Sequence, residues 1–423
     1  MPYKISGSKS ETSRIIVLKE SDWSIEANTV ISGSGVYEVD ELESGNKLVF
    51  GRSNDGWIEG FGNVTPVFYE SAGLILWGWG NNSVGQLGLG DTTKRLAPVQ
   101  IGTDNWLSIG SGGNHVLAVK QDGTLWACGY NLYGQLGLGD RVNRSSPIQV
   151  GSLTNWSKVS CGNNGHNLAL KTDGTLWAWG NNSYGPLGQG DETSYSSPVQ
   201  IGSDTDWNKI SAASSSSAGI KNNGALFMWG INSDGQLGLG DRISRSLPVQ
   251  VGDLITWNKI KPAGDRVFGI KTDGTLWAWG ANGYGVLGTG DIVPHSSPVQ
   301  IGSDTDWNVA QGGIYHSAAT KTNGTLWIWG RNNYGQLGLG DTVNVTGPTQ
   351  VGSLTDWDIA GGYGYSTAAI KQDGTLWSWG QNTYGQLGLG DEIHRSSPVQ
   401  VGSATDWNSI SPDNSVLALR SEN

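Results

Sequence analysis

One stretch of this chain recurs with a period of close to fifty residues. In the copy at residues 175–191 it reads TLWAWGNNSYGPLGQGD, an aromatic run that ends in Trp-Gly and leads into a glycine-rich loop. The seven copies place Trp79, Cys128, Trp179, Trp229, Trp279, Trp329 and Trp379 before that glycine. A fixed period of this length is typical of solenoids, propellers and repeat arrays. The repeat therefore constrains the fold of residues 71–423 before any single motif is considered.

Each repeat unit contains four strand candidates. In the second full copy they are residues 167–171, 175–179, 198–201 and 207–210. Asp-Gly or Asn-Gly pairs, such as the one at 173–174, supply the positive φ angles of a tight hairpin turn. We predict that these turns join the last strand of one unit to the first strand of the next. Four antiparallel strands per unit are the content of a propeller blade.

The number of turns predicts a closed ring. Seven strands of the Trp-Gly type occur, but only six Asp-Gly or Asn-Gly turns. SVLALR at 415–420 has the form of the strand before such a turn, and LILWGW at 74–79 has the form of the strand after it. Pairing these two strands closes a ring, whereas an open solenoid needs capping repeats at both ends. The predicted fold is all-β, a seven-bladed β-propeller of four-stranded blades.

Side-chain alternation explains why tryptophan is so frequent. In TLWAW, Thr175, Trp177 and Trp179 point to one face of the strand, and Leu176 and Ala178 point to the other. Large rings on one blade can then pack against small residues of its neighbour. A further series keeps the same period and consists of Trp106, Trp156, Trp207, Trp257, Trp307, Trp357 and Trp407. We predict that these tryptophans form the core between blades.

Composition excludes several classes of protein. The net charge is −11, so neither a basic nucleic-acid surface nor a DNA-binding tail is expected. The chain contains no run of 18 or more apolar residues, so no membrane-spanning helix is predicted. Its polar start lacks the apolar core of a signal peptide. Cys128 and Cys161 are interpreted as small buried residues, although a single disulfide between them stays open.

Residues 1–70 do not share the period. Short β-rich runs at 14–18, 36–39, 47–50 and 57–61 alternate with turn clusters and predict a small β-sandwich-like domain. The string SGSGVYEVDELESGNKLVFGRSNDG resembles carboxypeptidase-regulatory-like and collagen-adhesin B-type domains. Similar short β-domains precede repeats in some tailed-phage structural proteins. This resemblance implies a leader or attachment domain at 1–70 and a propeller at 71–423.

The loop motif NxxGQLGLGD carries a stronger resemblance. Together with the later strand that begins at His115 or His166, it resembles the repeat of the regulator of chromosome condensation family over about residues 71–420. The resemblance implies a seven-bladed propeller closed by pairing of the two chain ends. A phosphate loop would need a following helix, and a calcium loop would need several oxygen ligands, whereas here only Asp140 and its equivalents repeat. We interpret the glycines as turn formers and the Asp as an acceptor of backbone N–H groups.

Candidate partner-binding residues follow each loop Asp by four positions. They are Arg95, Arg144, Tyr195, Arg245, His295 and Arg395, with Val345 in the remaining copy. Because these residues occupy the same position in successive repeats, we expect them to form a ring on one face of the propeller. Arginine binds carboxylate and phosphate groups, so such groups are expected on the partner. The alternative is that they are solvated loop residues. A second variable set includes His115, His166, Tyr315, His316 and Tyr365, for which strand-entry hydrogen bonding is the alternative.

No motif for catalysis, metal binding or a cofactor is present, so a non-enzymatic structural or binding protein is predicted. The leader suggests display on a phage virion surface, as a decoration or tail component, in several copies. The family resemblance offers two alternatives. One is a soluble inhibitor of another protein, and the less favoured one is guanine-nucleotide exchange on a small GTPase. The expected partner is a protein or a particle surface, and the expected location is the virion surface or the cytoplasm.

Overall fold

The computed structural model describes residues 74–411 and 415–421, apart from the side chain of Tyr363, and the backbone of six earlier strands. These are β1 (Lys4–Ile5), β2 (Ser13–Lys19), β3 (Ile25–Ile31), β4 (Tyr37–Glu38), β5 (Lys47–Ser53) and β6 (Gly56–Trp57). One antiparallel sheet has the order β3-β2-β5-β6, and β1 pairs with β4. Strand β3 was not predicted, because Glu26, Ala27 and Asn28 are poor strand formers. The predicted sandwich packing and the boundary at residue 70 lie outside the described residues.

The blades are built from strands of five to seven residues, with one longer strand. The first strands are β7 (Leu74–Gly80), β8 (Arg95–Ser111), β9 (His115–Lys120), β10 (Leu125–Gly129), β11 (Arg144–Gln149), β12 (Trp156–Cys161), β13 (His166–Lys171), β14 (Leu176–Gly180), β15 (Tyr195–Gln200), β16 (Trp207–Ala212), β17 (Ser216–Lys221), β18 (Leu226–Gly230) and β19 (Arg245–Gln250). The remaining ones are β20 (Trp257–Ala263), β21 (Arg266–Lys271), β22 (Leu276–Gly280), β23 (His295–Gln300), β24 (Trp307–Gly312), β25 (His316–Lys321), β26 (Leu326–Gly330), β27 (Val345–Gln350), β28 (Trp357–Tyr363), β29 (Ser366–Lys371), β30 (Leu376–Gly380), β31 (Arg395–Gln400), β32 (Trp407–Ser411) and β33 (Ser415–Ser421). A short 3-10 turn, η1 (Gly283–Gly285), lies in one loop.

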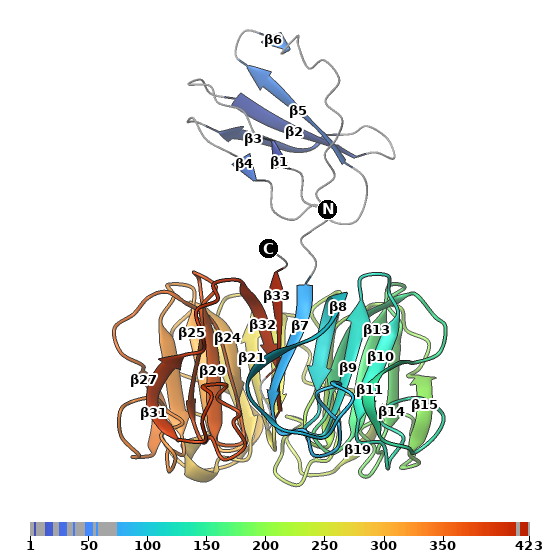
Figure 1. Cartoon of the computed structure of the whole chain (residues 1–423), viewed down its shortest axis with the longest axis vertical. Coiled ribbons are helices and arrows are strands. Elements are labelled where there is room, and N and C mark those ends of the chain that lie inside the picture. Colours follow the sequence, from blue (N-terminus) through green and yellow to red (C-terminus); the bar gives the residue numbers. More distant parts are fainter. Residues whose placement is uncertain are drawn as a thin grey trace. The chain divides into compact units, whose positions relative to one another are not determined.

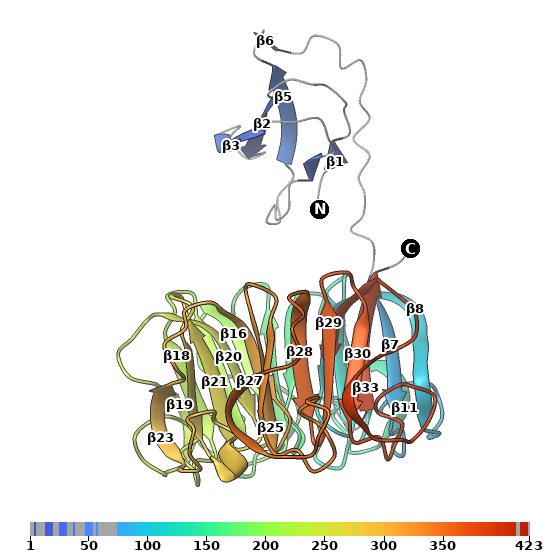
Figure 2. The same cartoon turned by 90° about the vertical axis from the view of Figure 1, so that its left-hand side faces the viewer.

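These strands form seven antiparallel blades around a ring (Figures 1 and 2). Blades one to six are β8–β11, β12–β15, β16–β19, β20–β23, β24–β27 and β28–β31. Blade seven consists of β32, β33, β7 and the first part of β8, which continues into blade one. The first strand of each blade is the inner one, since these strands line the central channel. The predicted seven-bladed propeller is confirmed.

The predicted grouping of strands into units is wrong by one position. The strand at 207–210 belongs to the next blade as β16, and β12 takes its place beside β13, β14 and β15. The Asp-Gly turn at 173–174 joins β13 to β14 inside one blade, because a tight hairpin forces its two strands to be neighbours in one sheet. The six residues 201–206 instead cross from the outer strand to the next inner strand.

The ring closes where the two chain ends meet. Strand β33 pairs with β7 over seven residue pairs, from Ser415 with Gly80 to Ser421 with Leu74. The two strands lie side by side in Figure 1. The predicted pairing is confirmed, and it replaces the seventh hairpin turn by a non-covalent contact.

In six of the seven blades a tryptophan contacts the preceding blade, and Cys128 takes this position in blade one. Trp179 is fully buried, and its Nε1 donates a hydrogen bond of 3.0 Å to the backbone carbonyl of Gln135 in blade one. Trp156 meets it with ring centroids 6.2 Å apart. Gly137 has a φ of 72°, and an added Cβ there would lie 2.9 Å from the Trp179 ring nitrogen. The glycine is therefore required both by its backbone conformation and by the tryptophan above it.

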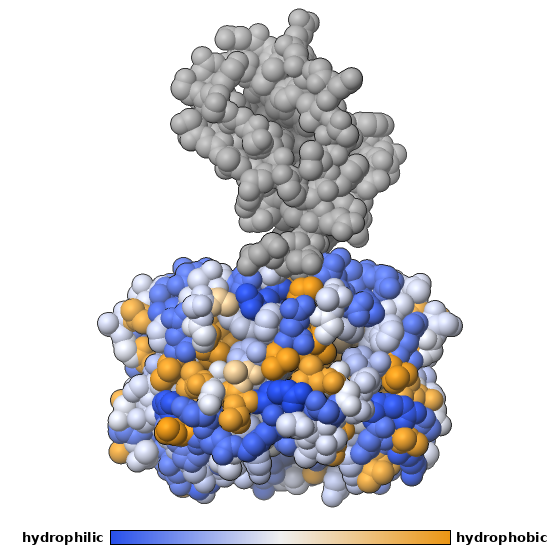
Figure 3. Space-filling model, in the orientation of Figure 1, coloured by the Kyte–Doolittle hydropathy of each residue, from blue (hydrophilic) through white to orange (hydrophobic). Residues whose placement is uncertain are grey.

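The propeller has two different faces. The Asp-Gly hairpins lie on one, which we call the turn face, and the glycine-rich loops lie on the other, which we call the loop face. Figure 3 shows hydrophobic residues on the visible side of the propeller in separate groups bordered by hydrophilic ones. Function on such a scaffold is expected where the copies differ, because the shared residues are used to build the blades.

Candidate protein-interaction site

Each glycine-rich loop is held by a buried asparagine. Asn332 is fully buried; its Nδ2 donates to the backbone carbonyl and to Oδ1 of Asp341 at 3.1 and 2.9 Å, and its Oδ1 accepts from the N–H of Leu337 at 2.9 Å. The equivalent residues Asn82, Asn131, Asn182, Asn232, Asn282 and Asn382 make the same contacts. The sequence prediction considered the glycines and the Asp but missed this residue. Its constant spacing of nine residues from the Asp is the signal that indicates the contact.

The loop Asp accepts backbone hydrogen bonds, as predicted. Asp140 Oδ1 accepts from the N–H of Val142 at 2.9 Å, and Oδ2 accepts from Arg144 Nη2 at 2.6 Å. The hydrogen bond from Val142, followed by the Arg144 guanidinium, holds the pKa of the Asp140 carboxyl below its usual range. The loop motif is therefore a structural device that is repeated in every blade.

Replacing the loop asparagine should destabilise the propeller. In Asn332→Ala the buried N–H of Leu337 loses its acceptor, and we expect a loss of about 2–4 kcal/mol in the free energy of unfolding. Asn333→Ala changes the exposed neighbour and should cost less than about 0.5 kcal/mol. Urea unfolding of both variants tests this, and equal losses would contradict the role assigned to Asn332.

The predicted ring of partner-binding residues lies at the start of the outer strands. Arg95, Arg144, Arg245 and Arg395 each form an ion pair of 2.6 Å with the Asp of their own loop. Tyr195 Oη donates to Asp191 at 3.0 Å. The Thr289 hydroxyl and, to a smaller extent, His295 hold the pKa of Asp291 low. The four arginines and Tyr195 thus already bind the Asp of their own loop through part of their polar groups. A role of this ring in partner binding stays a prediction.

A second group of residues comes together on the loop face of blades four to six. Its members are Tyr284, Tyr315, Arg331, Tyr334, Tyr365 and His394, which we call the Tyr–Arg cluster. The guanidinium carbon of Arg331 lies 4.8 Å from the ring centre of Tyr284, 5.4 Å from that of Tyr315 and 5.3 Å from that of Tyr365. Its Nη1 donates to Tyr365 Oη at 3.3 Å. The arginine is therefore held between three aromatic rings of three blades.

The aromatic rings of the cluster also contact one another. Tyr315 and Tyr365 are stacked, with centroids 4.8 Å apart and an interplanar angle of 22°. Tyr334 meets Tyr365 edge-on at 5.0 Å and His394 at 5.3 Å. His394 Nδ1 accepts the backbone N–H of Asn382 at 3.0 Å, which fixes the imidazole. The cluster is a rigid aromatic surface that carries one cation.

The Tyr–Arg cluster depends on departures from the repeat. The residues equivalent to Arg331 are Asn81, Tyr130, Asn181, Ile231, Ala281 and Gln381, so an arginine occurs in one copy of seven. Tyr315 and Tyr365 belong to the second variable set of the sequence analysis. Tyr284, Arg331, Tyr334 and His394 were missed. Tyr284 and Tyr334 share one repeat position, which is tyrosine in five of the seven copies and so does not stand out as variable. The packing of consecutive blades brings these loops together, and the sequence alone does not show these contacts.

Other members of the second variable set lie in the core. His115, His166 and His316 are at most 1% exposed. His115 Nε2 lies 2.7 Å from Asn167 Oδ1, and His316 Nε2 lies 2.8 Å from Thr367 Oγ1. Burial lowers the pKa of His115 to about 4 and those of His166 and His316 to about 3. These imidazoles are neutral at pH 7, and the contacts of His115 and His316 agree with the strand-entry hydrogen bonding of the alternative interpretation.

The two cysteines are buried, and neither forms a disulfide. Burial raises the pKa of the Cys128 thiol to about 12, so it is not a reactive thiolate. Within residues 74–411 and 415–421, no three His, Cys, Asp or Glu side chains are grouped as a metal site requires. In the same part of the chain no helix has the length and apolar character needed to cross a membrane.

Seven segments of the chain match the family model described as the regulator of chromosome condensation (RCC1) repeat. They are residues 75–119, 122–170, 173–220, 223–261, 273–320, 323–369 and 373–411. The chain belongs to the RCC1-repeat family. The RCC1 repeat builds a propeller that is a protein-interaction module, and the seven matches agree with the seven blades.

Solved RCC1-type structures have the same fold. Yeast RCC1 (Prp20), solved bound to Kap60, gives a TM-score of 0.73 at 20% identity and covers 83% of this chain and 89% of its own. Human WBSCR16 gives a TM-score of 0.72 at 20% identity, and the match covers 82% of this chain and 98% of WBSCR16. The ultraviolet-B receptor UVR8 of Arabidopsis thaliana is 30% identical over 142 residues. That alignment spans 32% of this RCC1-repeat chain and 32% of UVR8.

Proposed function

We propose that this RCC1-repeat propeller binds a partner protein through the Tyr–Arg cluster on the loop face of blades four to six. The observation that carries the proposal is the position of Arg331, the single arginine at its repeat position, between the rings of Tyr284, Tyr315 and Tyr365. Tyrosine and arginine are the residue types that contribute most to protein interfaces. The ring contacts cover the Arg331 side chain in part and leave it within reach of a partner.

The geometry favours an acidic group on the partner. Arg331 forms one long hydrogen bond to a neutral hydroxyl, so the rest of its guanidinium can donate to a carboxylate. The stacked Tyr315 and Tyr365 rings hold it in place, which lowers the entropy lost on binding. Tyr284 is 45% exposed and supplies apolar contact area beside the charge. The cluster therefore suits an acidic residue flanked by an apolar side chain.

The proposal predicts that truncating the cluster strongly weakens partner binding without unfolding the propeller. Arg331→Ala with Tyr334→Ala removes the cation and one ring, and we expect at least about 30-fold weaker binding. Asn181→Ala with Tyr184→Ala is the matched control, because these residues occupy the same positions in blade two. Cross-linking and affinity mass spectrometry from the native source identify the partner, and titration calorimetry then measures both variants. Equal binding by the two variants would refute the proposed site.

The similar structures are consistent with a protein partner. The yeast protein was solved bound to Kap60, and Prp20p of Saccharomyces cerevisiae is described with its binding to Gsp1p and histones. Those partners belong to the yeast protein, and this chain shares 20% identity with it. Display on a virion through residues 1–70, inhibition of another protein, nucleotide exchange and assembly of several copies stay predictions. Size fractionation of the native source distinguishes particle-bound from free protein.

A further inference from the structure

The wall of the central channel is formed by the inner strands of the seven blades. Each inner strand carries one of the repeated tryptophans, and the residue four positions after that tryptophan faces the channel. Together these seven residues form one layer of the wall, which we call a level. The residues at this level are Gly110, Ser160, Ser211, Lys261, Gln311, Gly361 and Ser411. They are small or neutral except for Lys261. A single blade thus places a cation at the level where the others carry glycine, serine or glutamine.

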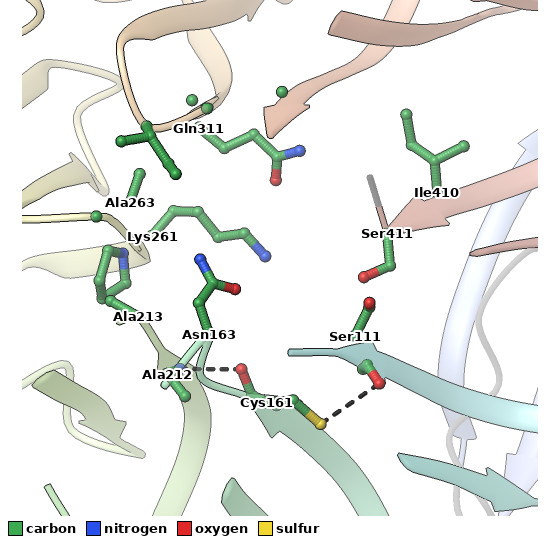
Figure 4. Close-up of a pocket in the computed structure, with 18 of the residues that line it drawn as sticks. Ser111, Cys161, Asn163, Ala212, Ala213, Lys261, Ala263, Gln311, Ile410 and Ser411 are labelled. Atoms are coloured by element: carbon green, nitrogen blue, oxygen red, sulfur yellow. Dashed lines mark hydrogen bonds between the residues drawn. The ribbon is translucent and has the colours of Figure 1, made fainter. Parts of the chain in front are cut away.

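Lys261 enters a cavity in this channel. The cavity has a volume of about 190 Å³. Figure 4 shows the ammonium of Lys261 directed toward its centre, with the side-chain amides of Asn163 and Gln311 and the hydroxyl of Ser411 around the same space. Among the described residues that line it there is no Asp or Glu. The surrounding strands desolvate the ammonium and lower the pKa of Lys261.

Three further lysines extend the positive charge toward the turn face. Lys158, Lys209 and Lys259 occupy the second position after the tryptophan of blades two, three and four, about 6.6 Å along the strand from the level of Lys261. Burial, then Lys158 and Lys259, lower the pKa of Lys209, so the three charges repel one another. Their ammonium groups donate to neutral oxygens in the next blade, those of Asn208, Asn258 and Asn308.

Some lysines elsewhere in the propeller have acidic partners, whereas Lys171 and Lys271 lie over tryptophan rings. Lys221 lies 2.8 Å from Asp204, and Lys321 lies 2.7 Å from Asp304. Within the described residues no carboxylate lies in ion-pair range of the four channel lysines, and Asp358 acts on Lys259 only at longer range. A chain with a net charge of −11 thus places one lysine without a carboxylate partner in this cavity and three more further along the channel wall. Like charges in one channel repel one another, and a bound anion offsets that repulsion.

We propose that the central channel is a binding site for a small tetrahedral oxyanion, namely phosphate or the phosphate group of a monoester. Lys261 supplies the charged ligand, and Asn163, Gln311 and Ser411 supply neutral hydrogen bonds. A lysine ammonium binds phosphate as a point charge without requiring the planar, bidentate geometry that arginine gives to carboxylates. A cavity of about 190 Å³ holds such an ion together with several waters, since one water takes about 30 Å³. The site lies in the channel and is separate from the Tyr–Arg cluster.

The test is titration calorimetry of the full chain at pH 7.5 and constant ionic strength. Inorganic phosphate, glycerol 3-phosphate and sulfate are titrated separately, with chloride as the background anion. Lys261→Gln removes the charged ligand, and Asn163→Asp introduces a carboxylate into the same cavity. Arg141→Gln removes one positive charge from an exposed position of the outer loops and is the matched control.

Phosphate should bind the wild-type chain and Arg141→Gln with equal affinity. Lys261→Gln should bind it at least about tenfold more weakly, and Asn163→Asp should not bind it measurably. Binding of glycerol 3-phosphate alone assigns the site to a monoester, and binding of inorganic phosphate assigns it to the free ion. Sulfate binding of equal strength supports a site for tetrahedral oxyanions in general. Absence of phosphate, monoester and sulfate binding in the wild type, or equal binding by Asn163→Asp, overturns the proposal.

Discussion

Deleting residues 415–423 should prevent the propeller from folding as a closed ring. Strand β33 lies between β32 and β7 and is the contact that joins the two ends of the chain. Val416, Leu417 and Leu419 are 3% exposed or less. Burial of a Val or Leu side chain stabilises a protein by about 1.5–3 kcal/mol. Loss of these three side chains therefore lowers the free energy of unfolding by roughly 5–9 kcal/mol. That is comparable with the about 5–15 kcal/mol that separates a folded domain from its unfolded chain.

The deletion also exposes two strand edges. Strand β7 loses seven paired residues, and β32 loses its neighbour as well. We expect the truncated chain to lack a cooperative thermal transition and to aggregate, because open edges pair with other chains. A synthetic peptide with the sequence SVLALRS, added in excess, should restore part of the transition by occupying the empty strand position. A truncated chain with the melting temperature of the full chain would show that the ring does not depend on this closure.

The stability of the propeller should fall steeply between pH 7 and pH 5. Burial holds the folded-state pKa of His115 at about 4 and those of His166 and His316 at about 3, below the roughly 6.5 of an unfolded histidine. Groups with a lowered folded pKa bind more protons in the unfolded chain, so their contribution is complete above pH 6.5 and is lost as the pH falls. At pH 5 each histidine lowers the free energy of unfolding by about 2 kcal/mol relative to pH 7.5, and the three together lower it by about 6 kcal/mol.

Urea unfolding at pH 7.5, 6 and 5 measures this loss. His316→Ser should reduce the pH dependence by about one third, and serine is the residue that the chain itself uses at the equivalent positions 216, 366 and 415. Asn333→Ala changes an exposed residue that does not titrate and should leave the pH dependence unchanged. A stability that is constant from pH 7.5 to pH 5 would contradict the buried, neutral state of the three imidazoles.

The RCC1-repeat sequence determined the architecture because its signals are local and repeated. The turn at 173–174 needs positive φ, and the alternation in TLWAW places Trp179 on the face that packs against another blade. The pairing of β33 with β7 also followed from the sequence, since the count of turns left one strand at each end without a neighbour. Such features depend on backbone geometry and on side-chain period, which a single chain shows in its own sequence.

Tertiary structure alone decided the grouping of strands into blades and the composition of the sites. The strand at 207–210 could be the last strand of one blade or the first strand of the next. The choice depends on which sheet it joins, and no local residue signals it. Arg331 contacts Tyr284 and Tyr365 because the packing of consecutive blades brings together three loops that are far apart in sequence. Lys261 has no distinguishing signal in the sequence, and it becomes a cation inside a channel cavity because the inner strands surround that space. These properties arise from the arrangement of distant segments around one axis, so they follow from the fold and not from any single repeat.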